Sequence, residues 1–406
     1  ALFLIAFGAV GASLGWWGMY RASTLRVRTD NYRRVLRDLQ SRRGDLFDRN
    51  GLPLAVTVGE PGSYMREYPD PAAAPVIGFT TAFYGQGGME SALDSWLRGE
   101  AGRSEFELWW YETILGIHLE GADAKLTIDR SLQDHGSIWF EELAGSAVVM
   151  RAGSGDILAL ISQPTFDPAT LGEEYEALAA DPVSPLLNRA TQGLYPPGSM
   201  LLPFFSAESL EHNRSLGESD PCAEVLMDWI LANPGIPDGV LDRFRFNRDP
   251  LLDLPTANVP GLSFPTGRTA VLREFTGDGT ILVSPMQMAL AFSSLAAGGM
   301  APAPQLVLRL ETPDGWIRPE PKSHPLAMVP SGTARHVREL LIGGEGNTAE
   351  WFGCGSSGQP AGGISWYAGM QNGGADPAVV IVALEGKPAD AVHIGRKLLA
   401  LLEDVE

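Results

Sequence analysis

The chain has 406 residues, more than one average domain, and its 45% hydrophobic and 9% aromatic content is enough for a sizeable core. This composition argues against global disorder. The formal net charge of −19 is unevenly spread: residues 1–50 hold nine Arg and four Asp and neither Lys nor Glu, a balance of +5, which leaves −24 for the rest. So acidic a region repels phosphate backbones, and no nucleic-acid partner is expected.

The first segment, Ala1–Tyr20, contains no charged residue. As a helix with a rise of 1.5 Å per residue it matches a hydrocarbon core of roughly 30 Å, with Trp16 and Trp17 suited to the interface. The alternative, the apolar region of a signal peptide, is normally about 7–15 residues long and fits less well. We predict a transmembrane anchor over residues 1–22, in a single-pass protein of the cell membrane whose bulk is extracytoplasmic. The arginines of residues 21–43 alone would favour the opposite orientation.

Two patterns follow the predicted anchor. Residues 23–130 combine short strands and loops rich in Gly and Pro with one helical stretch near Met89–Leu97. In residues 131–406 strands come first, helices follow and strands return, which predicts an α+β domain whose sheet is completed by both ends of that region. In chain order we expect strands at Ser146–Met150 and Asp156–Ile161, helices at Phe204–Glu211, Cys222–Ala232, Pro285–Ala297 and Ala334–Leu341, strands at Trp366–Met370 and Ala378–Leu384, and a closing helix at Asp390–Leu402.

A series of motifs runs through the chain from about residue 40 onward. In order they are Arg43-Gly-Asp-Leu-Phe-Asp-Arg-Asn-Gly51 with Leu54-Ala55; Tyr68-Pro, Val76-Ile-Gly-Phe and Tyr84-Gly-x-x-Gly-Met-Glu90; Leu126-Thr-Ile-Asp-Arg-Ser-Leu-Gln133; Asp156-Ile-Leu-Ala-Leu-Ile-Ser-Gln-Pro-Thr-Phe-Asp-Pro168; Leu187-Asn-Arg-Ala-Thr-x-Gly-x-Tyr-Pro-Pro-Gly-Ser199; and Gly277-Asp-Gly with Val283-Ser-Pro-Met-Gln-Met-Ala289. In order and spacing this series resembles the penicillin-binding protein family, specifically its short class B members.

The resemblance implies both a fold and a setting. Residues 131–406 would form a penicillin-binding, serine β-lactamase-like transpeptidase domain, an antiparallel sheet flanked by helices. Residues 23–130 would form the small N-terminal pedestal domain beneath it. The implied partners are the membrane and a polytopic peptidoglycan glycosyltransferase, in cell division or elongation, and no cofactor is implied.

The family's acyl transfer needs a serine nucleophile and a lysine one helical turn later, in the motif S-x-x-K, so that the amine can take the serine proton. Ser199 occupies the nucleophile position, but Leu202 stands where the lysine belongs. Leucine cannot accept a proton. Pro203 disfavours helix at Leu202, so we expect the helix to begin late or to be distorted. None of the four lysines has a serine three residues before it.

The other two catalytic motifs are also altered. For S-x-N, the nearest positional candidate is Ser219-Asp220-Pro221, where Pro221 replaces the amide. For K-T-G, the segment Gly355–Pro360 carries Ser356, Ser357 and Gly358, so Ser356 replaces the lysine that would bind a substrate carboxylate. The six His and two Cys show no metal-ligand spacing, so no metal is expected.

Three functions are compatible with these motifs. The first is a catalytically defective homologue, a pseudoenzyme that acts as a scaffold or regulator of a membrane glycan polymerase in peptidoglycan synthesis. The second is a residual penicillin-binding D,D-transpeptidase acylated at Ser199, with an unexpected base such as His212 or a carboxylate. The third is a non-catalytic module that senses peptidoglycan stem peptides in the old groove, although the missing lysine argues against it. Leu201, Leu202, Phe204 and Phe205 suggest a cleft filled by apolar side chains.

Overall fold

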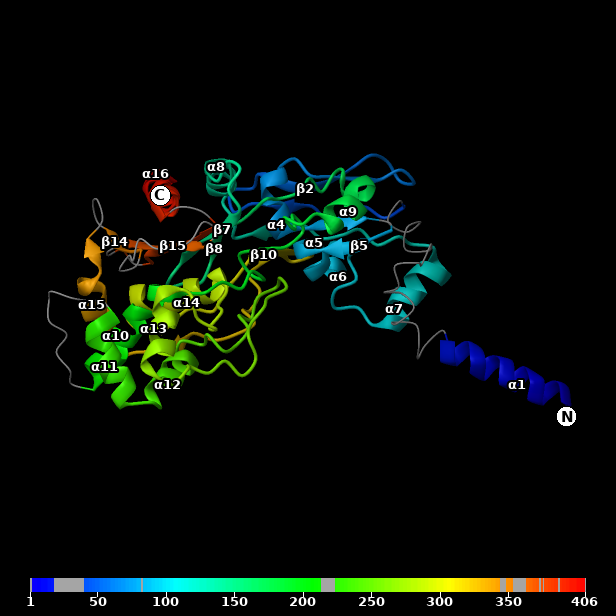
Figure 1. The fold of residues 1–406 in the computed structure, drawn as a ribbon. Coiled ribbons are helices and arrows are strands. Elements are labelled where there is room, and N and C mark those ends of the chain that lie inside the picture. The colour runs from blue at the N-terminus through cyan, green and yellow to red at the C-terminus, as the bar shows by residue number, and fades with distance from the viewer. Residues whose placement is uncertain are drawn as a thin grey trace.

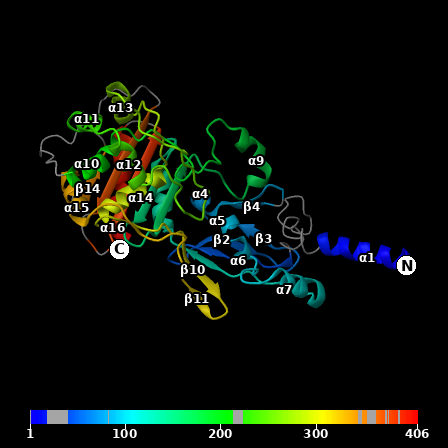
Figure 2. The ribbon, with the colours of Figure 1, turned by 90° about the horizontal axis from the view of Figure 1, so that it is seen from below.

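The computed structural model places the N-terminal helix outside a two-part body (Figure 1). A sheet near that helix forms one part, and a larger sheet covered by helices forms the other (Figure 2). The structure describes residues 2–17, 40–81, 83–212, 223–343, 348–352, 363–371, 374, 376–385 and 388–405.

The N-terminal helix α1 spans Leu2–Gly15 and carries no charged residue. Among the residues that the structure describes, no helix is both long enough and apolar enough to cross a membrane. At 14 residues α1 is shorter than the predicted span, and residues 18–22 lie outside the described chain. The transmembrane helix predicted over residues 1–22 is therefore not supported by the described helices.

The N-terminal sheet joins segments from both halves of the chain. Its strand order is β11-β10-β6-β1-β2-β3, in which β1 and β6 are parallel and the other pairs antiparallel. The bounds are β1 Leu46–Phe47, β2 Pro53–Val58, β3 Met65–Glu67, β6 Ala124–Leu126, β10 Val307–Thr312 and β11 Gly315–Ile317. The hairpin β10–β11 thus belongs to this sheet although it lies far beyond residue 130. The predicted domain limits at residues 22 and 130 stay predictions.

The rest of the N-terminal part consists of short helices and one hairpin. These are η2 Pro71–Ala73, α4 Ala74–Ile77, the strands β4 Phe79–Thr81 and β5 Gly85–Gly87, α5 Gly88–Ala92, α6 Asp94–Leu97, α7 Glu105–Trp109 and the π-helix η3 Trp110–Leu115. The helix expected near Met89–Leu97 is present as α5 and α6, with Leu93 between them. We did not predict α7 and η3.

A buried ion network ties these segments together. The Arg43 guanidinium donates from Nε to Glu90 Oε2 at 2.7 Å and from Nη1 to Asp94 Oδ1 at 2.6 Å. Arg66 donates from Nε to Glu90 Oε1 at 2.7 Å. Glu90 is fully buried, so both of its oxygens are paired with guanidinium groups instead of water. The network therefore joins the chain before β1 to β3, α5 and α6.

The second sheet is antiparallel and has the strand order β13-β14-β15-β16-β7-β8. Its strands are β7 Gly145–Arg151, β8 Ile157–Gln163, β13 Ile342–Gly343, β14 Thr348–Trp351, β15 Ile364–Gln371 and β16 Ala378–Glu385. Strands from the two ends of residues 131–406 lie side by side, because β16 pairs with β7. The predicted α+β fold with an antiparallel sheet completed by both ends is confirmed.

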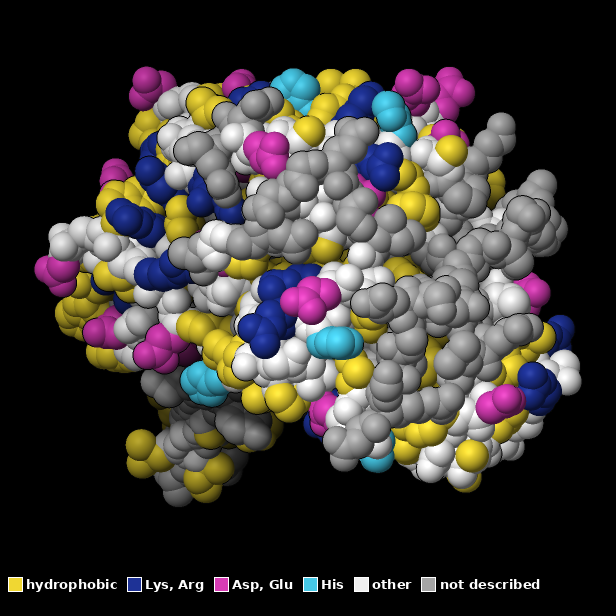
Figure 3. Space-filling view, turned by 90° about the vertical axis from the view of Figure 1, so that its left-hand side faces the viewer, with side chains coloured by type: hydrophobic (Ala, Val, Ile, Leu, Met, Phe, Trp, Pro, Cys, Tyr) yellow, Lys and Arg dark blue, Asp and Glu magenta, His cyan; other side chains and the backbone are white. Residues whose placement is uncertain are grey.

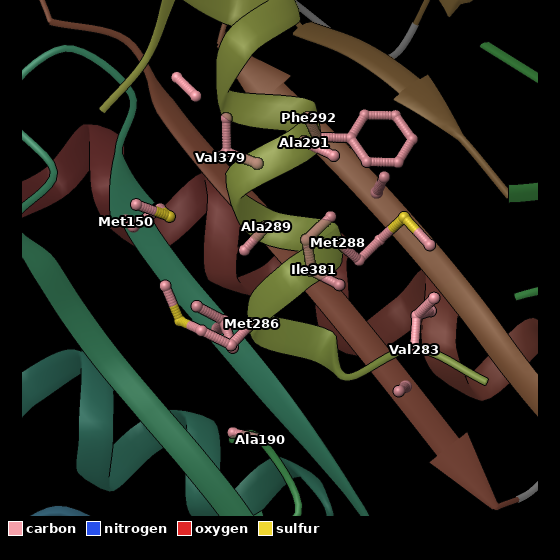
Figure 4. Close-up of a cluster of buried hydrophobic side chains, with 14 of the residues drawn as sticks. Met150, Ala190, Val283, Met286, Met288, Ala289, Ala291, Phe292, Val379 and Ile381 are labelled. Carbon is pink, nitrogen blue, oxygen red and sulfur yellow. The ribbon is translucent and has the colours of Figure 1, made fainter. Parts of the chain in front are cut away.

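Helices cover both faces of this sheet. On one face α14, Pro285–Ala296, lays Met286 and Met288 in the cluster that also contains Met150 of β7 and Val379 and Ile381 of β16 (Figure 4). On the other face α8, Arg130–Trp139, and α16, Pro388–Val405, pack on the alternate residues of the same strands. The remaining elements are α9 Leu171–Ala180, the 3-10 helix η4 Gly198–Leu201, α10 Leu202–Glu211, α11 Ala223–Ala232, α12 Ile236–Arg243, α13 Arg268–Thr276, β9 Met300–Ala301, β12 Leu326–Ala327 and α15 Ser331–Leu340.

Polar and aromatic contacts fix the N-terminal part against the larger domain. The side-chain amide of Gln133 on α8 donates to the carbonyl of Ala72 at 2.9 Å, and also bonds to both backbone polar groups of Leu160 on β8. The rings of Tyr84 and Tyr175 stack with centroids 4.1 Å apart. Because Gln133 bonds to groups in both parts, its hydrogen bonds help to hold the two parts together.

The Glu90 network yields a prediction about stability. Glu90→Gln keeps the side chain's shape but leaves Arg66 and Arg43 with less counter-charge, although Arg43 retains Asp94. We expect the free energy of unfolding to fall by about 3 kcal/mol, measured by urea denaturation. Glu67→Gln, an exposed position on β3, is the matched control and should change it by less than about 0.5 kcal/mol. Equal effects of the two changes would show that the network does not stabilise the fold.

Candidate active site and its relatives

Ser199 lies in the tight turn that leads into α10. The 3-10 helix η4 contains Ser199, and α10 begins at Leu202, with Pro203 in its first turn. Proline suits that place because the first backbone N–H groups of a helix have no partner within the helix. The α-helix therefore begins three residues after Ser199, as expected, but Leu202 is itself helical, so the expectation that Pro203 disfavours helix at Leu202 was wrong. Gly198 adopts φ +55, a left-handed conformation that glycine accepts without strain.

Two tryptophans from the second sheet hold this turn in place. The indole Nε1 of Trp351 on β14 donates to the carbonyl of Ser199 at 3.1 Å. The indole Nε1 of Trp366 on β15 donates to the carbonyl of Pro196 at 2.8 Å. The turn is therefore fixed against the sheet by its backbone. Sequence analysis missed both roles, because a lone tryptophan on a strand gives no signal of its hydrogen-bond partner.

Among the described residues, no side chain that could act as a base forms a hydrogen bond with the Ser199 hydroxyl. It is half-buried, and its hydroxyl makes no hydrogen bond to any side chain in the described part of the chain. Leu202, one turn later, is 1% exposed. A lysine at this position would have to lose its water shell within an apolar cluster. The geometry thus keeps the nucleophile position but offers no proton acceptor at the family's lysine position.

The interior below the turn is filled by aromatic rings. Phe204 contacts Phe244, Phe246 and Phe292 with centroid separations of 4.7, 5.3 and 5.0 Å. The neighbouring Phe205 packs in the same edge-on or tilted manner against two further rings, Phe264 and Phe275. Leu201, Leu202, Phe204 and Phe205 are all buried, as the predicted apolar filling requires, and they form part of the main core.

The alternative base His212 lies at the wrong end of α10. It follows the last residue of a ten-residue helix, so it is about 15 Å along the axis from the turn that holds Ser199. Its ring contacts the edge of Trp229, and Nδ1 lies 2.9 Å from the carbonyl oxygen of Glu208. His212 therefore cannot take a proton from Ser199 in this arrangement.

Other titratable groups near the turn are also unsuited. Glu350 precedes Trp351 on β14, so its side chain points to the opposite face of the strand. There Arg396 binds it with Nη2 to Oε2 at 2.7 Å, and Tyr367 donates to Oε1 at 3.0 Å. Tyr195 lies four residues before Ser199, and burial raises its pKa to about 12. A phenol with this pKa stays protonated at neutral pH and cannot act as the base.

The rest of the predicted site cannot be placed. Ser219, Pro221, Ser356, Ser357 and Gly358 lie outside the described residues, so their assignment as altered catalytic motifs stays a prediction. Figure 3 faces the end of the molecule where α10, α11 and α15 lie. Basic, acidic and histidine side chains all lie on the described part of this face. Within the described ranges no group of His, Cys, Asp or Glu has the arrangement of a metal site.

Two family models match the chain. Residues 43–124 match the penicillin binding protein A dimerisation domain, and residues 145–219, which include Ser199, match the penicillin binding protein transpeptidase domain. The first range contains the Glu90 network, and the second begins at β7. With the fold described above, these matches show that residues 43–124 and 145–219 belong to penicillin-binding protein domains, and the chain resembles the class B members of that family.

Curated relatives and solved structures support the same membership. The chain is 34% identical over 211 residues to the peptidoglycan D,D-transpeptidase PbpA of Mycolicibacterium smegmatis. This alignment covers 48% of this chain and 42% of PbpA. It is 33% identical over 136 residues to the peptidoglycan D,D-transpeptidase MrdA of Escherichia coli K12, and this alignment covers 31% of this chain and 22% of MrdA. The matched part thus spans less than half the length of these relatives. The imipenem acyl-enzyme structure of penicillin-binding protein A from M. tuberculosis covers 90% of this chain and 99% of its own, with TM-score 0.73. At 23% identity this likeness shows the fold alone.

The apolar surroundings of Leu202 can be tested directly. Leu202→Lys restores the S-x-x-K spacing, but it buries an ammonium group where the described residues offer no charged partner. We expect the free energy of unfolding to fall by about 3–5 kcal/mol. Leu202→Met, which preserves the volume, should lower it by less than about 1.5 kcal/mol. Urea denaturation measures both, and a lysine variant as stable as the methionine variant would reveal a polar cleft at this position.

Proposed function

We propose that this chain is a catalytically defective penicillin-binding-protein homologue that serves peptidoglycan synthesis as a scaffold or regulator. The observation that carries the proposal is the buried Leu202 at the lysine position, one turn after Ser199. A serine without a base is a weak nucleophile. No described side chain replaces the lysine, because His212 lies at the far end of α10 and Glu350 faces α16.

The N-terminal part and its junction with the larger domain, which could bind a partner, are held together by buried polar contacts. The Glu90 network stabilises the N-terminal part, and Gln133 joins it to the larger sheet. Such a rigid pair of domains suits a protein that positions or activates another one. By analogy with the family, the proposed partner is a polytopic glycan polymerase of the membrane. The proposed location is the extracytoplasmic side of the cell membrane, with the segment that begins at α1 as anchor.

One observation favours the second candidate, a residual transpeptidase. Ser199 is still present and half-buried at the turn into α10. A base from residues outside the described chain would suffice to activate it. The proposal and this alternative therefore differ in a measurable property, covalent reaction with a β-lactam.

Labelling with a fluorescent penicillin distinguishes the two. We expect no covalent adduct on the full chain after prolonged incubation, because the described residues offer Ser199 no proton acceptor. Peptidoglycan D,D-transpeptidase PbpA of M. smegmatis serves as the positive control, and Ser199→Ala measures any background. An adduct that Ser199→Ala abolishes would contradict catalytic loss and favour the residual enzyme.

The scaffold role needs a separate measurement. We expect the full chain, purified from its own membranes in mild detergent, to retain a polytopic glycan polymerase, and to raise the glycan-forming rate of that polymerase. The Ser199→Ala variant should do both equally well, because the role does not use the hydroxyl. Failure to associate with any such polymerase would exclude the scaffold role even if the chain binds no penicillin.

A further inference from the structure

A stripe of exposed apolar side chains runs along α7 and η3. Phe106 is 60% exposed, Trp109 42%, Trp110 43%, Ile114 50% and Ile117 47%. Scattered single apolar residues on a surface are ordinary, but a contiguous group of this size marks an interaction site. None of these side chains belongs to the two buried clusters that form the cores of the molecule.

The local sequence holds this stripe in a fixed form. Spacings of four residues place Phe106, Trp110 and Ile114 on one side of the helical segment, and Ile117 follows just after the end of η3. The helix begins with a capping box, in which Ser104 and Glu107 exchange side-chain and backbone hydrogen bonds. The chain leaves η3 at Gly116, which has the left-handed conformation common at helix ends.

The aromatic members of the stripe also touch one another. The ring centroids of Phe106 and Trp109 are 5.8 Å apart, those of Phe106 and Trp110 are 6.1 Å apart, and those of Trp109 and Trp110 are 6.4 Å apart. Leu108, in contrast, is buried. The rings therefore form a preassembled surface whose ordering requires little further loss of entropy on binding.

Composition and position indicate a lipid bilayer as the occupant. Tryptophan concentrates at membrane–water interfaces, where its ring is apolar and its N–H meets water. A second exposed apolar element is α1, with Phe3, Leu4 and Phe7 each more than 70% exposed. Both views place α7 at the end of the body that faces α1 (Figures 1 and 2). Two uncovered apolar elements at one end fit a single flat apolar phase better than two separate protein partners.

We infer that α7 and η3 form an interfacial helix that rests on the membrane and sets the height and tilt of the N-terminal part above it. The exposed carboxylates of Glu105 and Glu107 beside the stripe give no attraction to anionic lipids. Apolar burial drives the contact, so bilayers of phosphatidylcholine alone suffice. The inference deepens the membrane location proposed above and rests on it only for bringing the chain to a bilayer.

Photo-crosslinking to lipid tests this surface in the full chain. The protein is placed in nanodiscs of phosphatidylcholine that contain some phosphatidylcholine with a diazirine near the carbonyl end of one acyl chain. Adducts are then mapped by peptide mass spectrometry. We expect adducts within residues 105–117 as well as within α1. In the double variant Phe106→Ser, Ile114→Ser the yield in residues 105–117 should fall roughly tenfold or more, because two large apolar contacts are lost. Ile138→Ser, at a position on α8 that is 68% exposed, is the control for loss of an exposed apolar side chain elsewhere and should leave the yield in residues 105–117 unchanged.

Each result decides the inference separately from the proposed anchor. Adducts in α1 without adducts in residues 105–117 would overturn the inference and leave the anchor standing. Adducts in residues 105–117 without adducts in α1 would support the inference against the anchor. No adducts in either segment would overturn both.

Discussion

The fully buried carboxylate of Glu90 is the constraint on which the N-terminal part depends. Burial would raise its pKa, but the charges and hydrogen bonds of Arg66 and Arg43 outweigh burial and lower it on balance. An unpaired charge in this place would be strongly destabilising, so Arg43 and Arg66 must reach Glu90 when this part folds. Arg43 thereby fixes where the chain enters β1. Because β1 pairs with β6 and β6 with β10, the network also determines where a strand from the second half of the chain can join.

The same physical rule accounts for the Ser199 turn. A buried lysine at residue 202 would need a carboxylate, an amide or water as a hydrogen-bond partner. Leu202 needs only apolar neighbours, and Phe204 and Phe205 extend the apolar core along α10. Trp351 and Trp366 hold the turn through its backbone, and neither of these two contacts uses a charged side chain. The framework of a transpeptidase site can therefore persist without its chemistry, because packing and backbone hydrogen bonds are enough to maintain it.

The sequence predicted what depends on periodicity and ordered motifs. Long apolar strands such as β16, the helix α14 and the start of α10 only after Ser199 follow from patterns within a few residues. The β10–β11 hairpin was not assigned to the N-terminal sheet, because pairing of Val307 with Leu126 is a tertiary contact between segments far apart in the chain. The partners of Glu90 were missed for a similar reason. The motifs that contain Arg43 and Glu90 were both identified, but spacing alone does not reveal that distant motif residues form one ion network.

The rigid junction between the two domains links the proposed membrane contact of α7 and η3 to the proposed scaffold role. Gln133 satisfies polar groups of both domains, so a change in tilt of the N-terminal part must move α8 and the sheet on which α8 packs. If α7 and η3 rest on a bilayer, the bilayer fixes that tilt from below. The larger domain is then held at a defined place relative to the membrane without any catalytic residue. A scaffold needs this geometric certainty, whereas acyl transfer needs, in addition, a proton acceptor that the described surroundings of Ser199 do not provide.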